Sequence, residues 1–257
     1  MRISIIVANW KMNKSVSEAV RFVQELHSSL TENDEIEVVI APPFTSLNSL
    51  SEKFKDSPIK LAAQNVFCMP DGPFTGEISP RMLKDVGCDY VIIGHSERRD
   101  LFNESDEMIH AKIVAAIKND LIPILCVGER LQELRSGQTE AVLARQLDSA
   151  LQGLRSTDVE RLVIAYEPVW AIGTGETASP EDAQVGALWI RKRIQALFSA
   201  KISNGVWILY GGSVNPENAK ELLAQRDIDG ALVGGSSLDP KAFLKIIQTA
   251  VQAKRNK

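Results

Sequence analysis

Five polar side chains stand at or just after the ends of apolar runs, and their types suit proton-transfer chemistry. They are Asn9, Lys11, His95, Glu97 and Glu167. Glu167 is a single carboxylate that directly follows LVIAY, so it cannot lie far from an apolar core, where desolvation makes a carboxylate a better general base. His95 can move protons near neutral pH, and Lys11 can supply positive charge to an anion.

Each of these residues also has a structural interpretation. Lys11 could be a solvated surface lysine, because lysine is mostly exposed in folded proteins. His95 could be a hydrogen-bonded core residue, and Glu167 a paired structural glutamate. Glu97 could pair with one of the two arginines that follow it, so we assign it no proton transfer.

The stretch AYEPVWAIGTGETA at 165–178 places the Glu167 carboxylate at the start of an unusual loop. Pro168 stiffens the exit from the preceding apolar run, while Gly173 and Gly175 permit a tip conformation that β-branched residues resist. The residues between them are too apolar for an idle surface loop. They predict a lid that closes over Glu167 and excludes water, and a static packed loop is the alternative.

Paired glycines end two later runs, in YGGSV at 210–214 and LVGGSS at 232–237. They let backbone N–H groups converge on an anion without obstruction by side chains. Barrel enzymes often bind phosphate in the two loops at this place, although a purely conformational role is the alternative.

Eight short apolar runs rich in Val and Ile recur along the chain, each followed by a polar or glycine-bearing loop. Such runs are typical of parallel strands that are covered on both faces. The expected strands span residues 3–8, 37–42, 59–64, 90–95, 122–128, 162–167, 206–212 and 230–235.

Segments between the runs place apolar residues three and four positions apart, as amphipathic helices do. They predict helices over segments such as 15–30, 107–120 and 139–154, and a further helix in NPENAKELLA at 215–224, with Asn215 as its N-cap. Strands that alternate with helices imply parallel pairing with right-handed crossovers.

Eight βα units indicate an α/β protein with one (β/α)8 barrel domain over residues 1–257, because doubly wound open sheets usually have fewer strands. Active sites of such barrels lie where the strands end. The five polar residues stand at these ends, which favours the catalytic interpretation of Lys11, His95 and Glu167.

Composition and charge limit the classes of function. The chain has 257 residues, of which 44% are hydrophobic and 24% charged, as in ordinary globular proteins. A formal net charge of -4 without a basic run argues against nucleic-acid or membrane-surface binding. Cys68, Cys88 and Cys126 are too widely spaced for a disulfide framework or a zinc site, which favours a reducing, cytoplasmic location. The first apolar run is too short for a signal peptide or a membrane span.

Six motifs together resemble the triosephosphate isomerase family of single-domain TIM barrels. They are ANWKMN (8–13), FTGEIS (74–79), YVIIGHSERR (90–99), AYEPVWAIGTG (165–175), YGGSV (210–214) and LVGGSSL (232–238). The resemblance runs from residue 3 to about residue 250, and HSERR and the Glu167 loop carry it most specifically.

By this resemblance, Glu167 is the base that moves a proton between adjacent carbons of dihydroxyacetone phosphate and D-glyceraldehyde 3-phosphate, a reaction of glycolysis and gluconeogenesis. His95, as a neutral imidazole, polarises the carbonyl and shuttles protons on the enediolate oxygens. Lys11 and Asn9 bind the substrate and stabilise its developing negative charge. Glu97 lies beside them in a supporting role.

The resemblance also implies that backbone N–H groups of Gly173, Ser213, Gly234 and Gly235 hold the phosphate, with Gly173 arriving when the lid closes. Closure would protect an enediol phosphate from losing its phosphate in water. No cofactor and no metal are implied, because protein side chains meet the enediolate charge.

The segment 65–79 has neither helical nor strand periodicity, which in a compact domain suggests a functional or interfacial loop. By the resemblance it is a dimer loop, whose Thr75 reaches the neighbouring subunit's active site near Asn9, Lys11 and His95. A C2 homodimer is the simplest closed assembly.

Three positions depart from the family pattern as we expect it. Ala8 and Lys14 replace more usual glycines, which is tolerable if the local backbone does not require a positive φ. Glu176 stands where a basic residue usually follows GTG, at the C-terminal hinge of the lid. We expect it to change the balance between open and closed states without abolishing activity.

Two other functions stay open. Another phosphate-binding barrel enzyme, such as an isomerase or aldolase, would be marked by an acid pair or a Schiff-base lysine inside a strand, and the last five expected strands contain no lysine. A non-catalytic barrel that binds a phosphate ligand would tolerate loss of Glu167 or His95, and both are present.

Overall fold

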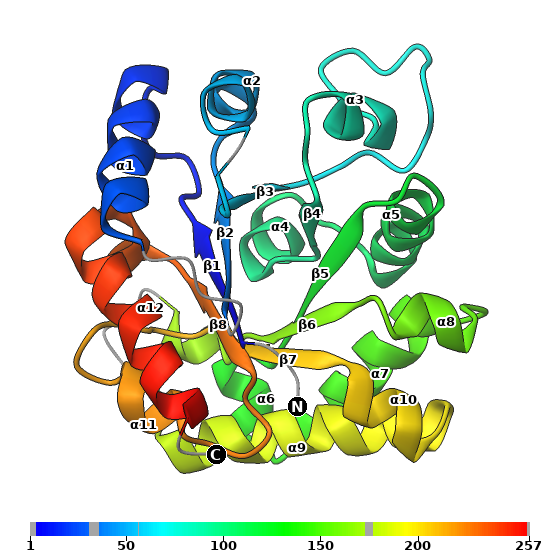
Figure 1. Cartoon of the computed structure of the whole chain (residues 1–257). Coiled ribbons are helices and arrows are strands. Elements are labelled where there is room, and N and C mark those ends of the chain that lie inside the picture. Colours follow the sequence, from blue (N-terminus) through cyan, green and yellow to red (C-terminus); the bar gives the residue numbers. More distant parts are fainter. Residues whose placement is uncertain (1–3, 31–35, 56, 173–176, 256–257) are drawn as a thin grey trace.

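Eight parallel strands pair in sequence order and close into a barrel (Figure 1). The computed structural model describes residues 4–30, 36–55, 57–172 and 177–255. The strands are β1 (Ser4–Asn9), β2 (Ile36–Ala41), β3 (Lys60–Ala63), β4 (Tyr90–Ile93), β5 (Ile122–Val127), β6 (Val163–Tyr166), β7 (Trp207–Tyr210) and β8 (Gly230–Val233). Each overlaps one of the eight apolar runs, so the predicted (β/α)8 barrel is confirmed.

Helices surround the barrel (Figure 1). The α-helices are α1 (Val16–Ser29), α2 (Phe44–Lys53), α3 (Pro80–Asp85), α4 (Ser96–Leu101), α5 (Asp106–Lys118), α6 (Leu131–Arg135), α7 (Thr139–Leu151), α8 (Ser156–Val159), α9 (Pro180–Leu197), α10 (Ala200–Gly205), α11 (Ala219–Leu223) and α12 (Pro240–Arg255), and the 3-10 helices are η1 (Val169–Ala171) and η2 (Gly235–Leu238). The three long helices predicted from the sequence are present as α1, α5 and α7. No helix in the described part of the chain is long and apolar enough to cross a bilayer.

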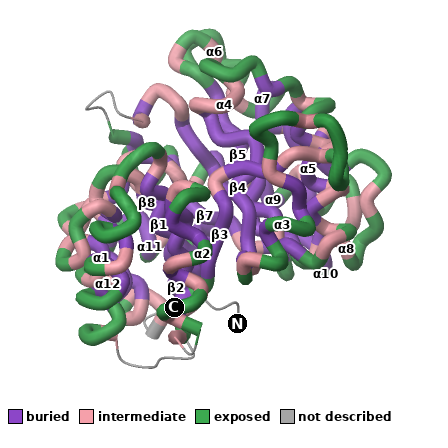
Figure 2. Tube along the Cα trace, turned by 90° about the horizontal axis from the view of Figure 1, so that it is seen from above, coloured by how far each residue is buried: buried purple, intermediate pink, exposed green. Residues whose placement is uncertain are grey.

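Burial of both strand faces explains why the strands are continuously apolar (Figure 2). Alternate residues belong to two separate buried clusters: Ile5 and Val7 join a cluster made only of strand residues, which fills the barrel interior. Ile6 and Ala8 join the larger cluster between strands and helices. A parallel strand between two apolar layers has no face on which a polar residue could alternate.

The barrel closes where β1 pairs with β8, with Ile5 opposite Gly230. A Cβ at Gly230 would lie only 1.9 Å from the carbonyl oxygen of Ile5. Glycine is therefore required at this position for the first and last strands to approach each other.

The helix predicted in NPENAKELLA begins later than expected, at Ala219. The Asn215 side chain accepts hydrogen bonds from the N–H groups of Glu217 and Asn218 at 3.0 and 2.9 Å. Asn215 therefore caps a turn that precedes α11, and the expectation that it is the N-cap of the helix is wrong.

Ala8 and Lys14 were expected to be tolerable if the backbone there does not require a positive φ, and this condition holds at Ala8 only. Ala8 lies within β1, where its backbone is extended. Lys14 has a φ of 71°, so its backbone does adopt the left-handed region that favours glycine. The lysine is accommodated there despite this preference.

The segment 65–79 forms neither helix nor strand in the structure, as expected. It closes on itself, because the N–H of Phe67 donates to the carbonyl oxygen of Ile78 at 2.9 Å and the rings of Phe67 and Phe74 lie 4.7 Å apart. Thr75 is exposed on this loop.

Candidate active site

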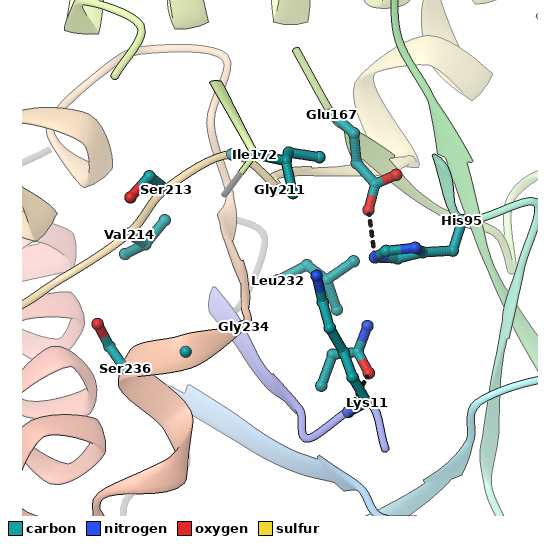
Figure 3. Close-up of a pocket in the computed structure, with 13 residues that line it drawn as sticks. Lys11, His95, Glu167, Ile172, Gly211, Ser213, Val214, Leu232, Gly234 and Ser236 are labelled. Atoms are coloured by element: carbon teal, nitrogen blue, oxygen red, sulfur yellow. Dashed lines mark hydrogen bonds and ion pairs between the residues drawn. The ribbon is translucent and has the colours of Figure 1, made fainter. Parts of the chain in front are cut away.

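Residues from the ends of several strands surround one cavity of about 250 Å³ at the carboxyl end of the barrel (Figure 3). The lining residues are Asn9, Lys11, His95, Glu167, Ile172, Gly211, Gly212, Ser213, Val214, Leu232, Gly234, Gly235 and Ser236. The structure thus brings together the residues proposed from the sequence except Glu97, which does not line the cavity, and Gly173, which lies outside the described residues.

Glu167 is held in a buried position immediately after β6. Its residue is 1% exposed, and its N–H donates to the carbonyl oxygen of Val127 at 2.7 Å. One carboxylate oxygen, Oε2, accepts a hydrogen bond from the N–H of Ser96 at 3.0 Å. The other, Oε1, faces His95, whose Nε2 is 3.2 Å away (Figure 3). One oxygen is therefore fixed by the backbone, and the other faces the imidazole.

The tautomer of His95 follows from its second ring nitrogen. The N–H of Glu97 donates to His95 Nδ1 at 3.2 Å. A backbone N–H can only donate, so Nδ1 presents a lone pair and the neutral imidazole carries its proton on Nε2. That nitrogen lines the cavity side of the ring and can donate to a substrate oxygen.

Lys11 follows β1 in a left-handed backbone conformation, with φ 52°. The Asn9 side chain accepts a hydrogen bond from the Lys11 N–H at 3.1 Å, and Gln64 donates to the Lys11 carbonyl oxygen at 2.8 Å. The turn that projects Lys11 into the cavity is thus satisfied at both backbone groups. Gln64 directly follows β3, and only the fold reveals its contact with the Lys11 turn.

Glu97 pairs with Lys11 across 2.6 Å, at a half-exposed position. The alternative that Glu97 pairs with a following arginine is wrong. Arg98 pairs with Glu104, and Arg99 pairs with Asp106 at 2.6 Å. Glu97 therefore contacts the proposed site through the Lys11 ammonium.

The two glycine pairs serve different needs. A Cβ at Gly211 would lie 2.8 Å from Glu167 Cγ, and one at Gly212 would lie 2.3 Å from the Tyr210 hydroxyl. The first pair therefore lets the Glu167 and Tyr210 side chains pack against the backbone. In the second pair, a Cβ at Gly234 would lie 3.7 Å from Lys11 Cε, and one at Gly235 would meet nothing within 4 Å. Gly235 therefore leaves open space beside its backbone N–H group, as an anion site requires.

The loop after Glu167 is anchored to Glu129. The Trp170 indole donates to Glu129 Oε1 at 2.8 Å, and the Val169 N–H donates to the Glu129 carbonyl oxygen at 3.0 Å. Tyr166 donates to the same carboxylate at 3.2 Å. Burial raises the pKa of the Glu129 carboxyl above its usual range, and these hydrogen bonds oppose that effect only in part.

The described start of the loop is packed, as its apolar sequence predicts. Ala171 is fully buried and Ile172 lines the cavity. Gly175 and Glu176, on which the expected tip and hinge depend, lie outside the described residues.

Cys126 is a further neighbour of Glu167 that sequence reasoning missed. It lies on β5 with its side chain in the barrel interior. Burial, followed by the negative charge of Glu167, raises the pKa of this thiol well above its usual range. Its sequence position inside an apolar run carries no signal that the side chain lies under the site.

All three cysteines are free thiols. Among the described residues, no group of three or more His, Cys, Asp or Glu side chains is arranged to hold a metal ion.

A family model described as triosephosphate isomerase matches residues 4–250 of the chain. The chain is similar to proteins named triosephosphate isomerase from Dictyoglomus turgidum, with 52% identity over 97% of this chain and 100% of that protein, and from a Roseiflexus species, with 48% identity over 96% of this chain and 97% of that protein. A third, from Symbiobacterium thermophilum, is 49% identical over 99% of both chains. The match spans the strands, the cavity and the loops around it, and the chain belongs to the triosephosphate isomerase family.

Proposed function

We propose that this chain is a triose-phosphate isomerase, an intramolecular aldose–ketose isomerase that interconverts dihydroxyacetone phosphate and D-glyceraldehyde 3-phosphate in glycolysis and gluconeogenesis. The observation that carries the proposal is the pairing of a buried carboxylate with an imidazole in one cavity. Glu167 Oε1 and His95 Nε2 lie 3.2 Å apart there, and the Lys11 ammonium enters the same space.

The proposed chemistry is a proton transfer between adjacent carbons. Glu167 removes a proton from C1 of the ketone, and the electron pair of that C–H bond forms the C1–C2 double bond as the carbonyl oxygen becomes negative. His95 donates its Nε2 proton toward this oxygen, while Lys11 and Asn9 stabilise the charge. The C1 hydroxyl then gives its proton back to His95 Nε2 and its O–H electron pair forms the C1–O double bond, while the electron pair of the C1–C2 double bond takes the proton from the conjugate acid of Glu167 at C2. The aldose is complete, and His95 and Glu167 regain their starting protonation states.

The phosphate is proposed to lie at the glycine side of the cavity, against backbone N–H groups of Ser213, Gly234 and Gly235. Gly173 belongs to the same proposal by family resemblance. The open space at Gly235 supports this placement. The reaction needs no metal or cofactor in this proposal, since His95 and Lys11 meet the negative charge.

The loop that begins at Pro168 is proposed to act as a lid. Its described part is anchored to Glu129 and ends at Ile172 on the cavity. Closure would exclude water from the intermediate, which strengthens each electrostatic contact to it. The hinge role of Glu176 stays a hypothesis, and equal kcat and KM for wild type and Glu176→Lys would contradict it.

We further propose a cytoplasmic homodimer of single-domain subunits that span residues 1–257. Exposure of Thr75 on the self-contained loop 65–79 supports the dimer contact. Met12, next to the catalytic Lys11, is 95% exposed, and an apolar side chain so exposed beside a proposed active site suits burial by a second subunit.

A coupled assay of D-glyceraldehyde 3-phosphate isomerisation, without added metal, tests the proposed function. Glu167→Gln keeps the size of the side chain and removes the base, so we expect kcat to fall by about 10³-fold or more. Glu25→Gln, an exposed glutamate on α1, is the matched control and should keep full activity.

Binding of inorganic phosphate to both proteins separates the possible failures. Retained phosphate binding by an inactive Glu167→Gln supports the role of the base. If the wild type is inactive but still binds phosphate, the proposed phosphate site is supported and the proposed isomerase activity is contradicted. That outcome would favour the non-catalytic barrel.

A further inference from the structure

Lys14 follows the turn that carries Lys11, and its own backbone is left-handed, with φ 71°. This region favours glycine, because the Cβ of other residues crowds the backbone there. Residues persist in such conformations when the surrounding structure holds them. The contacts of the Lys14 side chain show which groups hold this residue in its left-handed conformation.

The Lys14 ammonium is directed at the carbonyl end of η2. Its Nζ donates to the carbonyl oxygen of Leu238 at 2.8 Å, and it lies 4.8 Å from the ring centroid of Phe22 and 5.4 Å from that of Trp10. The Trp10 indole donates to the carbonyl oxygen of Ser237 at 3.1 Å. Two donors from one loop therefore hold the last two carbonyls of η2.

The opposite end of η2 forms the rim of the cavity. Gly234 and Gly235 line the cavity, and the N–H and hydroxyl of Ser237 both donate to the Gly234 carbonyl oxygen, at 2.9 and 2.7 Å. A Cβ at Gly234 would lie 3.7 Å from Lys11 Cε. One short turn thus connects the carbonyls held by Lys14 with the glycines beside Lys11.

The Lys14 side chain acts through this contact more than through its charge at a distance. The carboxylates of Glu18 and Asp239 both interact with the ammonium, and they offset its field toward the cavity. The hydrogen bond to Leu238 is charge-assisted and half-buried, and such bonds are stronger than neutral ones. Its removal should loosen η2.

We propose that Lys14 is a positioning residue for the substrate phosphate, which holds η2 against the Lys11 turn and so fixes the N–H groups of Gly234 and Gly235 relative to the Lys11 ammonium. The inference rests on the proposed function, because the phosphate at these glycines is part of it. Lys14 is not among the residues that line the cavity, so this role is exerted through η2.

Three substitutions test this role. Lys14→Met removes the hydrogen bond to Leu238 but keeps the apolar stem and a side chain in the left-handed conformation. Lys14→Gly removes the side chain and also the steric strain of this conformation. Lys14→Arg keeps a charged donor. For the first two we expect KM and the inhibition constant of inorganic phosphate to rise together, by about three- to tenfold, with kcat within about twofold of wild type. Lys14→Arg should recover most of the loss.

Lys241→Met, an exposed lysine at the start of α12, is the control for lost positive charge and should keep the wild-type KM. Wild-type phosphate affinity in both Lys14→Met and Lys14→Gly would overturn the proposal, as would a fall in kcat with unchanged KM. If Lys14→Gly does not fold, the comparison of Lys14→Met with Lys14→Arg still decides.

Direct titration of the wild type with inorganic phosphate distinguishes this inference from the isomerase assignment. If the wild type binds phosphate but has no turnover, only the proposed activity is contradicted. If the wild type binds no phosphate, the inference is overturned.

Discussion

Two adjacent backbone N–H groups at the start of α4 fix both groups that are proposed to move protons. The N–H of Ser96 donates to Glu167, and the N–H of Glu97 donates to His95. Since these donors belong to the backbone, their geometry depends on where the helix begins and less on which side chains occupy it. The relative position of base and imidazole is therefore set by one helix start.

Two buried thiols should be unreactive in the folded protein. Burial raises the pKa of Cys88 to about 12, and burial and Glu167 raise that of Cys126 well above its usual range. Because the thiolate is the nucleophile, only about one Cys88 in 10⁴ is reactive near pH 8. We expect iodoacetamide to label both residues in guanidinium chloride and neither in native protein, as measured by peptide mass spectrometry. Native labelling as fast as in the unfolded chain would contradict this expectation.

Glu129 should make the stability of the protein depend on pH. Burial raises its pKa above the ordinary value of 4.5, so the folded state binds this proton more tightly than the unfolded chain does. The free energy of unfolding should therefore fall as pH rises from about 4.5 through the raised folded value, and this contribution should stay constant above it. Urea unfolding of wild type and Glu129→Gln over this range measures the difference. Parallel pH profiles for the two proteins would show that Glu129 does not titrate as proposed.

The side chains proposed to face the substrate were accessible to sequence reasoning, because suitable residue types coincide with strand ends at Lys11, His95 and Glu167. The residues that support them were not. Cys126 stands inside an apolar run, and Glu129 gains its meaning from contacts with a loop about forty positions away, such as the bond to Trp170. Which side chains meet depends on the register of neighbouring strands and the path of the loops, and spacing along the sequence gives neither.

At the scale of elements, the eight strands were predictable because a parallel strand buried on both faces has a distinctive apolar run. Short helices such as α4, α6 and α8 were not, since four to six residues are too few for a helical period to show. The start of α11 was misplaced because Asn215 and Pro216 suit a turn as well as a helix N-terminus. Local signals therefore locate helices with a clear apolar period, such as α1, α5 and α7, and leave the short ones to tertiary contacts.

The carboxyl ends of β5 and β6 approach so closely that a methyl group cannot enter between them. A Cβ at Gly128 would lie 1.6 Å from the Glu167 carbonyl oxygen. We expect Gly128→Ala to displace one strand end, to lower the free energy of unfolding by about 3 kcal/mol and to reduce kcat by moving Glu167. Gly205→Ala is the control, because its Cβ would meet only Glu160 Cγ at 4.0 Å. Equal urea midpoints for the two variants would refute the steric account.

At the scale of the whole molecule, the proposed dimer can be tested through its loop. Thr75→Arg adds length and charge at an exposed position of the segment 65–79, which should prevent close approach of a second subunit. We expect light scattering to detect monomer at protein concentrations where the wild type is a dimer. On dilution, the specific activity of Thr75→Arg should begin to fall at a higher protein concentration than that of the wild type. Thr157→Arg, on the exposed part of α8, should leave both properties unchanged. A dimeric, fully active Thr75→Arg would place the interface elsewhere.

Strand β1 must wait for most of the chain to be synthesised before its second neighbour exists. Its partner on that side is β8, with Ala8 beside Val233, so until then an apolar strand presents a row of unpaired N–H and C=O groups. Exposed edges of this kind recruit strands from other chains. During nearly the whole of translation, the nascent chain can therefore associate wrongly through the exposed edge of β1. This exposure ends late, when β8 pairs with β1 and closes the barrel.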